Sequence, residues 1–278
     1  MVYKLTKLNA AIDRILKNIQ PSNKKTKILL DQANQRFNYN TLKSNLSLPE
    51  TLNSAVDGYG ISYKSFLKNP KTKFHVVALA KAGNPYPKKI MAQEAIEIYT
   101  GSILPKGVDT VVMFENCERT GSELLIKEEI KKYQNVRSIG ENIKKGEIII
   151  KKGDFLNPSY IGQLAASGNN EIEVFNKLKV AIISTGNEVV NLTGKKKSYG
   201  QIYDSNRPML RSIFNENYLE ILDMGIVKDT KNALVNKYLK CLSKCDVIIS
   251  SGGASEGIED HTQNALKHIG AESLVWQL

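Results

Sequence analysis

The chain has 278 residues, of which 41% are hydrophobic and 24% charged, and this composition is typical of a globular protein with two or three domains. No apolar run approaches the roughly 18 residues of a membrane span. Residues 1–6 show no sign of a secretory leader. We therefore expect a cytoplasmic protein that does not enter a membrane.

The formal charge of +11 comes mainly from lysines scattered singly or in pairs along the chain. The densest run is Lys195-Lys196-Lys197, and no basic stripe alternates with aromatic residues as in nucleic-acid binders. We expect no nucleic-acid partner, since a diffuse positive field suits small anionic ligands equally well.

The cysteines and histidines give little sign of metal or disulfide chemistry. The three cysteines are odd in number, which favours reduced thiols in a cytosolic protein. The three histidines follow no ligand spacing, so a zinc site is not expected.

The N-terminal half predicts helical segments and then β structure. Residues 4–19 carry apolar side chains at steps of three and four, which predicts an amphipathic helix ending before Pro21. Residues 28–37 indicate a second short helix by a weaker pattern. From about residue 46 to residue 142 the sequence pattern changes to turn signals and short strands, and this predicts an inserted β-rich domain. The expected strands there are 74–79, 95–99 and 110–114.

Residues 143–177 predict a strand at 148–150 and a half-exposed strand at 172–174. Between them, Pro158 fits the first turn of a helix that Gly168 can close in the left-handed conformation. Together with residues 1–45, this segment is expected to form an elongated α+β region used for dimerisation.

From Leu178 onward strands and helices alternate, which predicts an α/β domain over 178–278 with a parallel sheet and helices on both faces. The expected strands are 178–183, 219–223, 246–250 and 273–276. The expected helices are 205–216, 230–244 and 261–269. The chain would then end on a sheet strand, so we expect this domain to be incomplete.

Ser184-Thr185-Gly186-Asn187-Glu188 opens where the first of these strands stops. In such a loop Gly186 permits close backbone approach, and the hydroxyls of Ser184 and Thr185 can donate to anionic oxygens. Glu188 can hold a metal or receive a proton. The alternative is a plain strand-to-helix turn with a surface glutamate.

A second glycine-rich loop, 250–260, follows another strand of the same sheet. Two such loops at the carboxyl ends of parallel strands favour a nucleotide-binding crevice. In this arrangement Asp260 could face Glu188, and two carboxylates near a pyrophosphate commonly hold Mg²⁺.

Two further polar segments attract attention. In Gly200–Asn206, either Asp204 or Ser205 can cap the following helix, whose N-terminus also suits an anion. The polar pattern of the string Asn53–Gly60 argues against a core strand, and its small residues predict tight packing of the backbone around Asp57. Thr100 similarly presents a hydroxyl on a tight turn.

These strings, the segment Tyr99–Asp109 and the stretch Gln201–Asn206 together resemble the molybdopterin molybdenumtransferase family, which includes MoeA and the C-terminal domain of gephyrin. The resemblance runs in order along the whole chain. It implies an enzyme that inserts molybdate into adenylated molybdopterin and releases AMP with the help of Mg²⁺. It also implies a homodimer whose cleft combines the α/β domain of one subunit with the N-terminal domains of its partner.

The resemblance further implies roles for individual residues. Asp57 and Thr100 match functional positions from the partner's side of the cleft, while Glu188 and Asp260 match the carboxylates that hold Mg²⁺ and the nucleotide phosphates. The expected catalytic residues are these four. The expected substrate-binding residues are Ser184, Thr185, Gly186, Asn187, Asp204, Ser205, Asn206, Ser251, Gly252, Gly253 and Ser255.

Two departures from the family pattern stand out. Asn142 replaces a residue that is usually acidic, and an amide supplies neither charge nor a base. The family's Pro-rich loop and C-terminal β-barrel do not appear, so we expect a truncated member that dimerises but has impaired activity. The alternatives are a pterin adenylyltransferase, which residues 178–278 alone resemble, and a molybdopterin-binding scaffold without catalysis.

Overall fold

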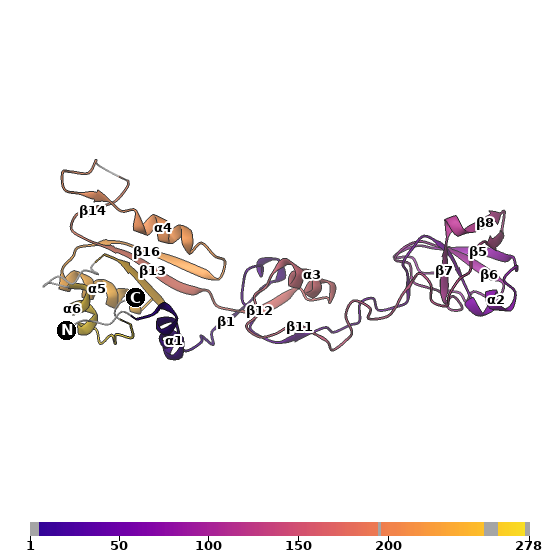
Figure 1. Cartoon of the computed structure of the whole chain (residues 1–278), viewed down its shortest axis with the longest axis horizontal. Helices are drawn as coiled ribbons and strands as arrows, with labels where there is room; N and C mark the ends of the chain where they lie inside the picture. The colour runs from indigo at the N-terminus through magenta and orange to yellow at the C-terminus, as the bar shows by residue number, and fades with distance from the viewer. Residues whose placement is uncertain (1–5, 194–195, 253–260, 276–278) are drawn as a thin grey trace. The chain divides into compact units, whose positions relative to one another are not determined.

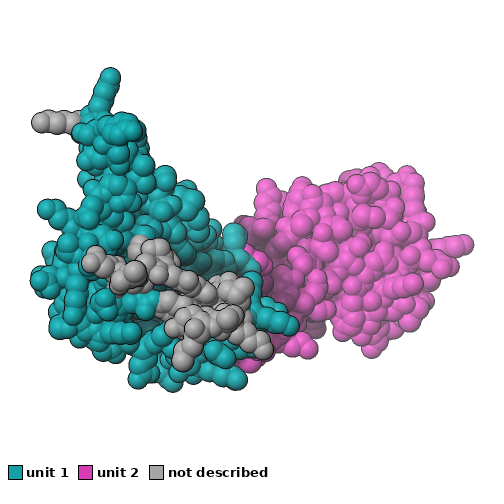
Figure 2. All heavy atoms as spheres, turned by 60° about the vertical axis from the view of Figure 1, so that its left-hand side comes forward, with its two compact units in different colours: residues 1–40, 152–158, 171–278 teal, residues 41–151, 159–170 magenta. Residues whose placement is uncertain are grey.

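A computed structural model describes residues 6–193, 196–252 and 261–275. The chain divides into two compact units, shown in different colours in Figure 2. Unit 1 comprises residues 1–40, 152–158 and 171–278, and unit 2 comprises residues 41–151 and 159–170. The division into 1–45 plus 143–177, 46–142 and 178–278 stays a prediction.

Unit 2 is built mainly of short strands, as its sequence predicts. Its largest sheet has six strands in the order β7-β4-β6-β5-β9-β8. The elements of this unit are β2 (Leu42–Lys43), β3 (Asn53–Ser54), β4 (Gly58–Ile61), α2 (Tyr63–Lys68), β5 (Phe74–Ala80), β6 (Glu94–Ile98), β7 (Thr110–Met113), η2 (Phe114–Asn116), β8 (Cys117–Thr120), β9 (Glu123–Ile126), β10 (Val136–Arg137), β11 (Ile148–Ile150) and most of α3 (Pro158–Ala166).

The strand β4 corrects the prediction that the string 53–60 is too polar to lie in a core strand. All four residues of β4 are buried, and the strand lies between β6 and β7. Gly58 allows this because a Cβ atom built on it would meet the carbonyl oxygen of Val112 on β7 at 2.0 Å. The glycine supplies close backbone contact where a side chain would not fit.

Unit 1 holds the parallel sheet that the sequence predicts. Its strands lie in the order β16-β13-β17, and β13 pairs in parallel with both neighbours. The elements of this unit are α1 (Leu8–Asn18), β1 (Lys25–Leu29), η1 (Leu30–Gln32), β12 (Glu171–Phe175), β13 (Leu178–Thr185), β14 (Val189–Val190), β15 (Ile202–Tyr203), α4 (Asn206–Ile213), β16 (Leu219–Val227), α5 (Lys231–Leu242), β17 (Val247–Ser251) and α6 (His261–His268).

Helices cover both faces of this sheet, as Figure 1 shows. Ala181 and Ile183 of β13 share a buried cluster with Leu234 of α5 and Ala265 of α6. The intervening residue Ile182 is fully buried on the opposite face, where α4 contacts β13. Because successive side chains of a strand point to opposite faces, the continuous apolar run of β13 serves both layers.

Two predicted elements are wrong. Residues 28–37 do not form a helix, since β1 runs to Leu29 and pairs antiparallel with β12, and a 3₁₀ turn follows. Residues 273–275 form no strand, and residue 276 lies outside the described ranges. The first error arises because the partner of β1 is more than 140 residues away, as in the pair Thr26 and Val174.

The three cysteines are free thiols. Cys117 lies in unit 2, while Cys241 and Cys245 lie in unit 1. Burial, together with the nearby carboxylate of Glu128, raises the pKa of the Cys117 thiol to about 12. In the part of the chain that is described, no helix has both the length and the apolar character needed to cross a bilayer.

Candidate functional site

The carboxyl ends of the parallel strands bring the two polar loops to one edge of the sheet. Ser184 on β13 is paired with Ser251 on β17, and Thr185 is paired with Val227 on β16. Because the three strands end at the same level, the loops that follow them begin side by side.

The hydroxyl groups at this edge are bonded to one another and to the chain. Ser184 Oγ donates to Asp204 Oδ1 at 2.9 Å, and Ser251 Oγ donates to Ser184 Oγ at 3.3 Å. Thr185 Oγ1 donates to the carbonyl oxygen of Ser251 at 3.0 Å. The hydrogens of Ser184 and Thr185 are therefore engaged within the protein, whereas the sequence suggested that they would donate to anionic oxygens.

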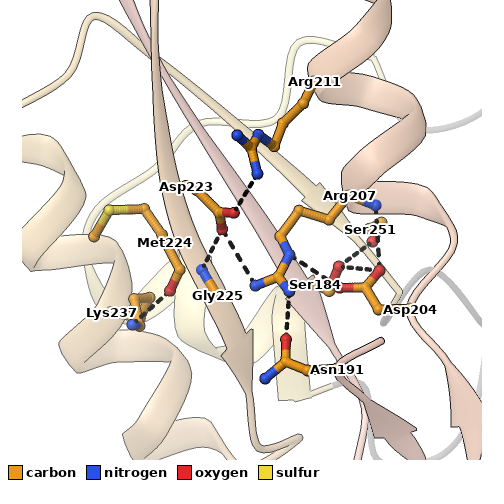
Figure 3. A network of polar contacts seen from close by, with 10 residues as sticks. All are labelled: Ser184, Asn191, Asp204, Arg207, Arg211, Asp223, Met224, Gly225, Lys237 and Ser251. Carbon is orange, nitrogen blue, oxygen red and sulfur yellow. Dashed lines mark hydrogen bonds and ion pairs between the residues drawn. The ribbon is translucent and has the colours of Figure 1, made fainter. Parts of the chain in front are cut away.

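Asp204 belongs to a polar network (Figure 3) and is only 4% exposed. Its Oδ2 lies 3.1 Å from Nε of Arg207, and its Oδ1 accepts the backbone N–H of Arg207 at 3.2 Å. The Arg207 guanidinium also lies 3.2 Å from Asp223 of β16 and donates to Asn191. Asp204 thus connects the end of β13 to helix α4 and, through Arg207, to β16.

The same contact decides which residue caps α4. Asp204 accepts the N–H of Arg207 in the first turn, whereas the side chain of Ser205 makes no capping hydrogen bond. Ser205 and Asn206 are exposed, so both remain accessible to a ligand. Asp204, which the sequence groups with them, is instead buried.

Two glycines let the loops leave the sheet tightly. Gly252 has a φ of +90°, and a Cβ atom there would lie 2.5 Å from the carbonyl oxygen of Thr185. Gly186 has a φ of +144°, and its N–H donates to the carbonyl oxygen of Val227 at 3.2 Å. Both positions favour glycine because L side chains rarely adopt such conformations.

Carboxylates also gather at this edge. Glu188 is exposed, and its oxygens lie 2.8 Å from the position of a Cβ atom built on Gly186, so the carboxylate lies over the turn. Asn187 Oδ1 accepts the backbone N–H of Asp229 at 3.2 Å. Asp229 was missed from the sequence, although it follows the third strand end at the same edge. Its Oδ1 is buried with no hydrogen-bond partner among the described residues.

Several predicted site residues cannot be placed. Gly253, Ser255 and Asp260 lie outside the described residues. Within the ranges that the structure describes, no three His, Cys, Asp or Glu side chains gather as a metal site. The pairing of Glu188 with Asp260 therefore stays a prediction.

Asp57 and Thr100 meet in unit 2. Asp57 precedes β4 and Thr100 follows β6, and the antiparallel pairing of these strands places Gly58 opposite Ile98. The backbone N–H and the hydroxyl of Thr100 both donate to Asp57 Oδ1, at 2.7 and 2.8 Å. These two bonds hold the pKa of the exposed Asp57 carboxyl below its usual value, and the backbone bond contributes more than the hydroxyl bond.

The segments around this pair are bonded along their backbones. The N–H of Gly101 donates to the carbonyl oxygen of Ser54, and the N–H of Ser54 donates to that of Ser102, both at 2.9 Å. Farther along unit 2, Asn142 Oδ1 accepts from the guanidinium of Arg137 at 3.2 Å. The amide at position 142 is thus a neutral partner for an arginine.

Comparison with known proteins places the chain in a family. Residues 6–168 match the family model described as "MoeA N-terminal region (domain I and II)", and residues 181–277 match that of a "Probable molybdopterin binding domain". The molybdopterin molybdenumtransferase of Haemophilus influenzae is 32% identical, with 87% of this chain and 59% of the relative covered. That of Staphylococcus aureus is 29% identical, with 95% and 63% covered.

A solved structure agrees with these relatives. The molybdopterin biosynthesis MoeA protein of Pyrococcus horikoshii superimposes with a TM-score of 0.81 and 31% identity, over 96% of this chain and 67% of that one. The chain spans 59% and 63% of the length of the two curated relatives above. Both regions of the chain, the strand-rich unit and the parallel α/β sheet, are accounted for by these matches. The chain belongs to the MoeA family.

Proposed function

We propose that the chain acts in molybdenum cofactor biosynthesis by binding adenylated molybdopterin, inserting molybdate into it and releasing AMP. The observation that carries this proposal is the edge of the parallel sheet, where the loops after β13 and β17 begin side by side. Curated relatives named molybdopterin molybdenumtransferase support it. The match to the N-terminal region favours this activity over that of an adenylyltransferase.

In this proposal Mg²⁺ is held by oxygen ligands at the same edge. Glu188 is exposed at the loop, and Asp229 has a buried carboxylate oxygen without a hydrogen-bond partner among the described residues. Carboxylate oxygens suit this cation, which keeps several waters and bridges phosphate oxygens. Asp260 is proposed as a further ligand on the strength of the sequence resemblance.

We also propose that two copies of the chain form a homodimer in which Asp57 and Thr100 of one copy act on the substrate held by the other. Helix α1 supports an association of this kind. Its apolar residues Leu8 and Leu16 are 60% and 63% exposed, and Ile19 directly after the helix is 56% exposed, which is unusual for an amphipathic segment.

Release of AMP from adenylated molybdopterin, measured with and without molybdate and Mg²⁺, tests the activity. We expect release to depend on both, and Glu188→Gln to slow it by at least about tenfold because a metal ligand loses its charge. Glu220→Gln is the matched control, since Glu220 is exposed near the opposite end of β16. Equal rates for the wild type and Glu188→Gln would contradict the role of Glu188.

The dimer has its own test. Chains carrying Asp57→Asn and chains carrying Glu188→Gln should each be impaired, and mixing them should restore part of the activity. Sedimentation should give a dimer at micromolar concentration. A monomer, or mixtures no more active than their components, would count against the shared site.

A further inference from the structure

The hydroxyl groups at the ends of β13 and β17 form a chain with a fixed direction. Ser251 Oγ donates to Ser184 Oγ, and Ser184 Oγ donates to Asp204 Oδ1 (Figure 3). A hydroxyl has one hydrogen and two lone pairs, so a hydroxyl that donates in one direction can only accept in the others.

The direction of the chain is set by Asp204. This carboxylate is buried and paired with Arg207, whose guanidinium is itself held by Asp223. An ionised carboxylate accepts hydrogen bonds and does not donate them. Ser184 must therefore give its hydrogen to Asp204, and the hydrogen of Ser251 is directed to the lone pair of Ser184.

The hydroxyl of Thr185 also uses its hydrogen within the protein, because it donates to the backbone carbonyl of Ser251. In this arrangement the hydroxyl hydrogens of all three residues are directed to partners within the protein. Ser251 is half-buried at the strand end, and with its hydrogen on Ser184 its oxygen presents lone pairs to a ligand. Such an oxygen binds an N–H group and repels a phosphate or carbonyl oxygen.

We infer that Ser251 is a specificity-determining residue that accepts a hydrogen bond from an N–H group of the ligand's heterocycle. Arg207 and Asp204 are positioning residues that set the direction of this acceptor. The inference rests on the proposed function, whose substrate carries amino groups on both the pterin and the adenine ring. The shared chemistry is an aromatic amino group, and the experiment distinguishes its two sources.

Calorimetric titration of the 278-residue chain with two matched pairs of compounds tests this assignment. AMP is compared with inosine monophosphate, and pterin with lumazine; in each pair the second compound has a carbonyl oxygen in place of the amino group. We expect the amino compound of one pair to bind about tenfold more tightly, and Ser251→Ala to reduce this preference to about twofold. The pair that shows the preference identifies the ring.

Ser250→Ala is the matched control. Ser250 precedes Ser251 on β17, and its Oγ accepts from the hydroxyl of Tyr238 on α5, so it belongs to the other face of the sheet. We expect this variant to keep the preference of the wild type, with both variants melting close to the wild-type temperature.

The outcomes separate the inference from the proposed function. Equal weakening of both compounds of a pair by Ser251→Ala would mean that the hydroxyl contacts the phosphate or merely shapes the site, which overturns the inference alone. A preference that persists in Ser251→Ala, or is absent from both pairs in the wild type, also overturns it. A wild type that binds none of the four compounds contradicts the proposed function and the inference together.

Discussion

The sequence predicts that Asp57 in unit 2 and Asp204 in unit 1 both contact the substrate, yet their surroundings differ. Asp57 is exposed, and its two hydrogen bonds from Thr100 both reach Oδ1. Asp204 is 4% exposed and faces the guanidinium of Arg207 and the hydroxyl of Ser184. The second oxygen of Asp57 takes no part in the bonds to Thr100, whereas Asp204 is enclosed by its partners.

The difference separates two ways in which a carboxylate can serve a site. An exposed carboxylate that is oriented by a neighbour can meet a ligand or a proton directly. A buried one that is bonded on several sides fixes the groups around it, and its removal affects stability more than chemistry. A similar position at a loop in the sequence therefore does not imply a similar role.

The largest expected effect is the loss of stability when the buried carboxylate of Asp204 loses its arginine partner. Arg207→Ala leaves Asp204 buried without its cation, so we expect unit 1 to be destabilised by about 3 kcal/mol. Amide hydrogen exchange of peptides from β13 and β16 measures the loss within this unit.

Arg211→Ala is the control for this measurement. Arg211 also lies 3.2 Å from Asp223, but its side chain is 57% exposed against 13% for Arg207. An exposed ion pair contributes about 0–1 kcal/mol, so little change is expected. Similar losses of stability in Arg207→Ala and Arg211→Ala would mean that the burial of an arginine does not determine how much it stabilises unit 1.

A smaller loss of stability is expected in unit 2, where strand β4 directly follows the exposed Asp57. Gly58→Ala places a Cβ atom against the carbonyl of Val112, so β4 must move from β7 and carry Asp57 away from Thr100. We expect unit 2 to lose about 2 kcal/mol, measured by urea denaturation. Gly162→Ala in α3 has open space around it and should instead stabilise the unit by about 0.5–1 kcal/mol. Destabilisation by both variants would argue against the close approach of β4 and β7.

The smallest effect concerns the pKa of Asp57. In Thr100→Val the hydroxyl donor is lost while the backbone N–H remains, so the pKa should rise part of the way toward its ordinary value. Carboxyl-carbon NMR during an acid titration measures this shift. Thr120→Val, at an exposed position on β8, should leave the pKa unchanged. An unchanged value in Thr100→Val would exclude the hydroxyl as a cause of the depression.

The same shift has a consequence for stability. The pKa of Asp57 is lower in the folded chain than in the unfolded one, where it is about 3.9. Its contribution to stability is therefore fully present above the unfolded pKa and is lost as the pH falls through the folded pKa. Thr100→Val should narrow that pH window.

Local patterns in the sequence were sufficient for the α/β domain. The apolar run of β13 and the periodic helices around it carry their own signal, and the parallel sheet follows from their alternation. The error at residues 28–37 has the opposite cause, since β1 is specified by its pairing with β12, far away in the chain. The local propensity of residues 28–37 does not identify a pairing strand that is distant in the sequence.

The site was predictable to the same extent. The strand ends that carry Ser184 and Ser251 could be located from the pattern, and the family resemblance identified Asp57 and Thr100 as candidates, but their direct hydrogen bond is visible only in the structure. The burial of Asp204 could not, because it depends on Arg207 reaching across to Asp223 on another strand. Asp229 carried a usable signal, since it follows the third strand of the same edge.

Because each unit contains its own cysteines, the reactivity of their thiols can be used to probe each unit separately. The thiolate is the reactive form, and with a pKa of about 12 Cys117 is almost entirely protonated at pH 8. Burial likewise raises the pKa of Cys241 and Cys245. Alkylation of the fully buried Cys241 should therefore follow transient opening of unit 1, whereas the half-buried Cys117 and Cys245 can react without it, slowed by their raised pKa. Peptide mass spectrometry of one labelled sample would compare the three thiols without any introduced probe.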